Sequence, residues 1–129
     1  MGIKLEEIVM ANKFVIIIQA GAQDAGKALH GLLYGQELHH AGYEVEIVFD
    51  GAGTTWVGEF EKTDHMFHPV FKDVMKLGII KGGCQACSGF FDVKEEVKNG
   101  VGFAGPEAES GKHLDFAGYI KKGFQPIIL

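Results

Sequence analysis

The sequence predicts an α/β protein: a three-layer sandwich with a mostly parallel sheet of about five strands and helices on both faces. Apolar runs of strand length alternate along the chain with segments whose apolar residues recur at helical spacing. Glycine residues separate these segments. With 19 of 129 residues, glycine is about twice as frequent as its usual ~7%. The length suits one domain, which we expect to span residues 1–129.

The first half of the chain contains two strand patterns separated by one helix pattern. Residues 14–18 are continuously apolar, as in a strand that is covered on both faces. Residues 26–41 repeat apolar side chains along one helical face, and Gly42 follows as a helix-terminating glycine. Residues 44–49 alternate and then become apolar, which predicts a second strand that the glycine-rich residues 50–53 end.

The second half continues the alternation in shorter segments. Apolar residues from Phe67 to Val74 have helical spacing, Pro69 is acceptable in the first turn, and Gly78 closes the segment. The remaining expected elements are a strand from Ile79 to Gly83, a helix through Phe90, Val93 and Val97, a short strand at 101–104, a helix near 112–122 and a strand at 125–129.

Charge and apolar run length exclude several classes of function. Twelve basic and 17 acidic residues give a net charge of −5, without the clustered cations that a nucleic-acid partner requires. The longest strong apolar run, residues 14–18, is far shorter than the roughly 18 residues that span a bilayer. Acidic residues near the start replace the positive charge of a signal peptide. We therefore expect a cytoplasmic protein with no membrane and no nucleic-acid partner.

In a parallel sheet, ligands and chemistry gather beyond the carboxyl ends of the strands. In this chain that edge comprises residues 19–26, 50–56 and 82–88, and the last segment carries both cysteines, Cys84 and Cys87. Two cysteines do not make a disulfide scaffold, so we expect free thiols in a reducing compartment.

Cys84 closes the third predicted strand, and a helix is expected to begin a few residues later. The N-terminus of a helix offers unpaired N–H groups that favour the thiolate, which is the nucleophilic form of cysteine. We therefore expect Cys84 to be an accessible, ionised nucleophile. The alternative is that both cysteines are small buried side chains. Cys87 could resolve an oxidised Cys84, carry sulfur itself, or merely pack.

The segment from Gly83 to Glu96, GCQACSGFFDVKEE, resembles the cysteine turn of the DsrE/DsrF-like family, which includes the TusD-type sulfur-relay subunits. The spacing from Cys84 to Val93 fits the pattern of that turn, and residues 68–74 resemble the helix that precedes it. The similarity covers about residues 13–129.

The resemblance implies that Cys84 carries a persulfide. The chain would then be a sulfur carrier that accepts sulfane sulfur from one protein and passes it to another, as a homotrimer or homohexamer. We expect no cofactor and no bound metal. At residues 90–92 the chain has Phe-Phe-Asp, where many relatives carry arginine.

Two other functions use the same cysteines. A CxxC pair at the start of a helix is also the arrangement of thiol–disulfide oxidoreductases, in which Cys84 and Cys87 would both act. His65 and His68 would complete a Cys₂His₂ zinc set with them, which would make the chain a metal- or ligand-binding module.

A phosphate-binding loop is a further alternative. Residues 21–28 nearly match GxxxxGK[ST], and Asp50 would be the strand-ending acid of such a site. Ala28 stands where a hydroxyl side chain would ligate Mg²⁺, so we favour an ordinary strand-to-helix turn capped by Asp24. The single tryptophan, Trp56, is expected to pack rather than to bind a ligand.

Overall fold

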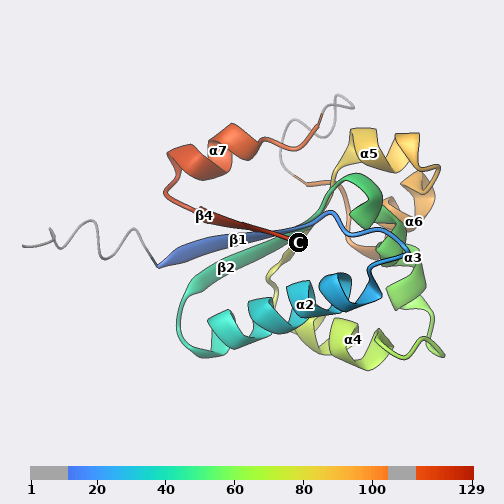
Figure 1. The fold of residues 1–129 in the computed structure, drawn as a ribbon, viewed down its shortest axis with the longest axis horizontal. Coiled ribbons are helices and arrows are strands. Elements are labelled where there is room, and N and C mark those ends of the chain that lie inside the picture. The colour runs from blue at the N-terminus through green and yellow to red at the C-terminus, as the bar shows by residue number, and fades with distance from the viewer. Residues whose placement is uncertain (1–11, 105–112) are drawn as a thin grey trace, which may run out of the picture.

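The computed structural model describes residues 12–104 and 113–129 (Figure 1). Its centre is a parallel sheet in the order β3-β2-β1-β4. The strands are β1 (Lys13–Ile18), β2 (Glu44–Phe49), β3 (Ile80–Gly83) and β4 (Gln125–Ile128). The predicted α/β class is confirmed, with four strands in the sheet where about five were expected.

Helices lie on both faces of this sheet, with α2 and α4 on one side and α7 on the other (Figure 1). The helices are α2 (Ala25–His40), α3 (Trp56–Glu61), α4 (His68–Lys76), α5 (Gln85–Phe90), α6 (Lys94–Gly100) and α7 (Phe116–Lys121), and a 3₁₀ turn, η1, spans Gly51–Thr55. Among the described residues, no helix is both long and apolar enough to cross a bilayer.

Two expected elements differ from the prediction. The helix expected through Phe90 and Val97 is broken into α5 and α6, because Asp92 adopts a left-handed conformation with φ of 57° between them. The strand expected at 101–104 is reduced to a single parallel bridge between Phe103 and Gly83. Gly102, with φ of 79°, turns the chain away from an extended course directly before that bridge.

The turn after β2 continues into a helix that the sequence did not indicate. Trp56 begins α3 and is buried, and its indole Nε1 donates to the carbonyl oxygens of Ala20 (2.9 Å) and Gly21 (3.2 Å). The predicted packing role of Trp56 is confirmed, and these bonds fasten the loop after β1 to α3. Asp24 does precede α2, but its side chain makes no capping hydrogen bond.

The core consists of two apolar layers, one on each face of the sheet. Ile16 and Ile18 of β1 point into the larger layer, which α2, α3, α4 and α6 cover. Val15 and Ile17 point into the smaller layer, which contains Cys84. Both faces of β1 are therefore covered, which accounts for its continuous apolar run. The acidic N-terminal residues and residue 112, used in the sequence predictions, lie outside the described residues.

Candidate functional site

The carboxyl ends of β1, β2 and β3 meet at one edge, as the strand–helix alternation predicted. Gln19 follows β1, and its Nε2 donates to Oδ2 of Asp50, which follows β2 (2.8 Å). The backbone N–H of Asp50 donates to the carbonyl of Ile18 (2.9 Å), and that of Cys84 donates to the carbonyl of Phe49 (2.8 Å). These bonds place Asp50 and Cys84 at the ends of adjacent strands.

Cys84 is the N-cap residue of α5, and its Sγ accepts a hydrogen bond from the backbone N–H of Cys87 (3.3 Å). The predicted position between a strand and a helix is confirmed. The expectation that Cys84 is accessible is wrong, because the residue is 0% exposed. Apolar side chains of the smaller layer surround it: Val15, Ile17, Val48, Ala104, Leu114 and Phe124.

The second thiol lies nearer the surface than the first. Cys87 is partly exposed, and its Sγ donates to Oδ1 of Asp50 (3.5 Å). Partial burial, a hydrogen bond with Cys84 and the charges of Cys84 and Asp50 raise the pKa of Cys87 to about 12, although a backbone hydrogen bond with Gly51 acts in the opposite direction. Cys87 therefore keeps its proton at neutral pH and acts as a hydrogen-bond donor.

Asp50 is the charged centre of this edge and is 4% exposed. Its Oδ1 lies 3.0 Å from Nε2 of His113, whose other ring nitrogen, Nδ1, lies 3.1 Å from the carbonyl oxygen of Leu114. The sequence indicated Asp50 only as the acid of a nucleotide site, and it gave no indication of a role for His113. The position after a strand was the signal for Asp50, whereas no local pattern pointed to His113.

Asp50, Cys84, Cys87 and His113 together form what we call the Asp–Cys–Cys–His cluster. One ligating atom from each lies within 4.8 Å of the others. The alternative set with His65 and His68 is not formed. The His65 ring packs edge-on against Phe60, and His68 Nδ1 lies 2.7 Å from the carbonyl oxygen of Phe60.

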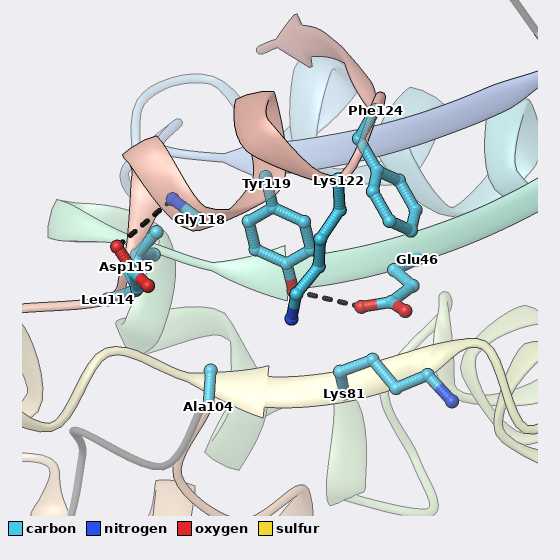
Figure 2. A pocket seen from close by; sticks show the side chains of 9 residues that line it. All are labelled: Glu46, Lys81, Ala104, Leu114, Asp115, Gly118, Tyr119, Lys122 and Phe124. Atoms are coloured by element: carbon cyan, nitrogen blue, oxygen red, sulfur yellow. Dashed lines mark hydrogen bonds between the residues drawn. The ribbon is translucent and has the colours of Figure 1, made fainter. Parts of the chain in front are cut away.

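A cavity of about 340 Å³ lies beside the apolar surroundings of Cys84 (Figure 2). Its lining includes Ala104, Leu114 and Phe124, which also belong to the smaller core layer. Figure 2 shows Tyr119 of α7 directed at Glu46 of β2, and its hydroxyl donates to Glu46 Oε1 (2.9 Å). Burial, the charge of Glu46 and this hydrogen bond raise the pKa of Tyr119 well above its ordinary value.

Tyr119→Phe is expected to lower the free energy of unfolding by about 1 kcal/mol at pH 7, because Glu46 loses a partly buried donor. The raised pKa of Tyr119 favours the protonated native state, so the wild-type advantage is complete below pH ~10 and shrinks as the pH rises further. Urea unfolding at pH 7 and at pH ~11 measures both effects. Tyr34→Phe, on exposed α2 surface, is the matched control, and equal changes in the two variants would contradict the prediction.

No protein-family model matches the chain, and no solved structure matches it. The chain is similar to an uncharacterized protein of Methanocaldococcus jannaschii, with 29% identity over 101 residues that cover 78% of each chain. The name of that relative states no activity.

Proposed function

We propose that this chain is a sulfur carrier of the DsrE/DsrF-like kind that holds sulfane sulfur as a persulfide on Cys84. The observation that carries the proposal is the hydrogen bond from the Cys87 backbone N–H to Cys84 Sγ (3.3 Å). A backbone donor at this distance stabilises negative charge on sulfur. The dipole of the six-residue helix α5 adds little stabilisation of the sulfur charge beyond this hydrogen bond. The positive charge at the N-terminus of a helix is the partial charge of its unpaired N–H groups, and the bond already uses such a group.

Loading exchanges one sulfur–sulfur bond for another. The Cys84 thiolate attacks the outer sulfur of a donor persulfide, R–S–SH, and a bond forms between Cys84 Sγ and that sulfur. The S–S bond of the donor breaks, and the donor leaves as the thiolate R–S⁻. An acceptor thiolate then takes the outer sulfur from Cys84 in the same way. Electrons balance in each step, so the transfer requires no cofactor.

The burial of Cys84 adds a requirement for movement. Leu114 packs in the same layer as Cys84, while α7, which follows it, contributes no buried residue. In the proposed function this segment gives up its contacts, among them the hydrogen bond from Tyr119 to Glu46, and moves aside during transfer, and it covers the persulfide between transfers. A carried sulfur is thereby shielded from solvent thiols.

The partners in this proposal are a protein donor and a protein acceptor that dock in turn in the cytoplasm. The exposed Phe90 (84%) and Phe91 (38%) follow the cysteines on α5 and its end, and they offer an apolar contact for such partners. We propose a homotrimer or homohexamer as the carrying assembly.

A thiol–disulfide oxidoreductase is the second candidate, and the proximity of the two sulfurs favours it. Cys84 and Cys87 lie within 4.8 Å of each other, and the partly exposed Cys87 gives access to the pair. In that function a substrate disulfide, R–S–S–R, accepts two electrons and two protons and leaves as two thiols, while the two cysteines become a disulfide.

Incubation of the reduced, metal-free chain with a small-molecule persulfide donor tests the carrier proposal. We expect the intact mass to increase by one sulfur atom in the wild type and in Cys87→Ser, and not in Cys84→Ser. Cys87→Ser is the matched control, because it removes the neighbouring thiol and keeps the backbone donor. Normal loading of Cys84→Ser would overturn the assignment, and disulfide reduction that needs both cysteines equally would favour the oxidoreductase.

A further inference from the structure

We propose that the Asp–Cys–Cys–His cluster is a zinc site in the reduced chain. The cluster supplies two thiol sulfurs, one imidazole nitrogen and one carboxylate oxygen from Asp50, Cys84, Cys87 and His113. Thiolate and imidazole ligands suit zinc, whereas magnesium and calcium prefer sites made of oxygen ligands. Sulfur transfer on Cys84 has no use for the imidazole of His113, so this set of donors goes beyond the proposed function.

The distances fit a tetrahedral ion after small shifts. Zinc bonds of about 2.0 Å to nitrogen or oxygen and 2.3 Å to sulfur place neighbouring ligand atoms about 3.3 to 3.8 Å apart. Asp50 Oδ1 lies 3.0 Å from His113 Nε2 and 3.5 Å from Cys87 Sγ. All four ligating atoms lie within 4.8 Å of one another, and a tetrahedral ion places sulfur and nitrogen or oxygen ligands about 3.5 Å apart, so contraction by about 1.3 Å at most closes the set.

The surrounding hydrogen bonds orient the carboxylate and the imidazole as a metal requires. Gln19 Nε2 donates to Oδ2 of Asp50, which leaves Oδ1 directed at the cluster. Nδ1 of His113 lies 3.1 Å from the carbonyl oxygen of Leu114, an acceptor that favours a proton on Nδ1. In that tautomer Nε2 carries no proton, so it can bind a metal ion in place of its present contact with Asp50. Zinc-ligating histidines generally donate their second ring N–H to such an acceptor.

The sulfur of Cys84 also has a partner that suits a bound thiolate, because the N–H of Cys87 donates to it (3.3 Å). Three ligands are held by the strand ends and α5, while His113 comes from a separate segment and its side chain is 58% exposed. The ion therefore enters from the side of His113.

Zinc and sulfane sulfur would compete for the same atom. A zinc-bound Cys84 cannot attack a donor persulfide until the metal leaves, so metal occupancy would keep the carrier inactive. This consequence rests on the proposed function, whereas the zinc site itself does not.

Zinc titration of the fully reduced, chelator-stripped chain against a chromophoric chelator tests the site. We expect one zinc per chain, and cobalt in its place should show thiolate charge-transfer absorption with the visible bands of tetrahedral geometry. Loss of an outer-shell partner of a metal site already costs about 10- to 100-fold in affinity, so His113→Ala, Asp50→Asn and either cysteine-to-serine variant, each of which removes a ligand, should weaken zinc binding by at least about 10-fold. His39→Ala, on the exposed end of α2, is the control and should bind as the wild type does.

His113→Ala keeps this test independent of folding and of sulfur transfer. The His113 side chain is largely exposed, and Asp50 keeps its hydrogen bonds from Gln19 and Cys87 when His113 is removed, so we expect the variant to fold and its sulfur loading without metal to equal that of the wild type. A wild type without stoichiometric zinc, or a His113→Ala chain that binds zinc as tightly, would overturn the zinc site and leave the carrier proposal standing. Loss of sulfur loading in metal-free Cys87→Ser or His113→Ala would contradict the carrier proposal and would leave the zinc assignment unaffected.

Discussion

Gly53→Ala is expected to destabilise the chain by about 3 kcal/mol or more. A β-carbon at this position would overlap the carbonyl oxygen of Ile18 and would lie 2.6 Å from the carbon of that carbonyl. Both atoms belong to the backbone at the end of β1, the strand that pairs with β2 on one side and with β4 on the other. The clash can be relieved only by moving the centre of the sheet or the turn η1.

The same substitution is expected to damage the candidate site. The N–H of Gly53 donates to the carbonyl of Asp50 (2.8 Å), so the turn that Gly53 closes also fixes the residue that binds Gln19 and His113. Any Gly53→Ala chain that still folds should therefore bind zinc more weakly than the wild type.

Gly26→Ala is the matched control for Gly53→Ala. Nothing lies within 4 Å of a β-carbon at Gly26, in the first turn of α2, so alanine should stabilise the helix by about 0.5 to 1 kcal/mol. Urea unfolding followed by the fluorescence of Trp56 measures both changes. Equal midpoints for the two alanine variants would contradict the expected clash.

Phe60→Ala is expected to lower the free energy of unfolding by about 3 to 5 kcal/mol. Phe60 is 0% exposed, and its ring stacks on Trp56 at 5.3 Å and packs against Phe71 at 5.6 Å and Phe49 at 6.4 Å. Helix α3 is only six residues long, so its attachment depends on such contacts rather than on its own hydrogen bonds. The cavity left by alanine would loosen α3 against the sheet.

Phe90→Ala is the control, since Phe90 is 84% exposed and its removal should change stability by less than about 0.5 kcal/mol. Thermal and urea unfolding measure the difference between the two variants. Phe60 lies in the larger layer, on the face of the sheet opposite the layer of Cys84. Zinc binding per folded molecule should therefore survive in Phe60→Ala. A loss of unfolding free energy no greater than that in Phe90→Ala would contradict the prediction and show that the side chains around Phe60 are loosely packed.

Local patterns in the sequence were sufficient for the main elements. The unbroken apolar run at 14–18 predicted a strand covered on both faces, and the structure has apolar layers on both sides of β1. Gly42 and Gly78 follow α2 and α4 with φ of 94° and 74°, a conformation that glycine adopts without a steric penalty. Alternating elements with such ends also located the edge where Asp50 and Cys84 lie.

Two features differ from what local patterns predicted. Helical spacing carried one predicted helix through Phe90 and Val97, yet a local backbone reversal at Asp92 separates α5 from α6. The position of Cys84 at the end of β3 was predictable, whereas its burial depends on Leu114 and Phe124, which return to the sheet from later in the sequence.

The sequence by itself therefore determined the α/β class, the positions of the four strands of the sheet, and the placement of Cys84 between β3 and a helix, because these depend on periodicity and on residues near in the chain. Only the tertiary structure decided that Cys84 is buried and that His113 lies against Asp50 (3.0 Å). Burial and side-chain proximity arise from packing between distant segments, and no local pattern records which segments meet.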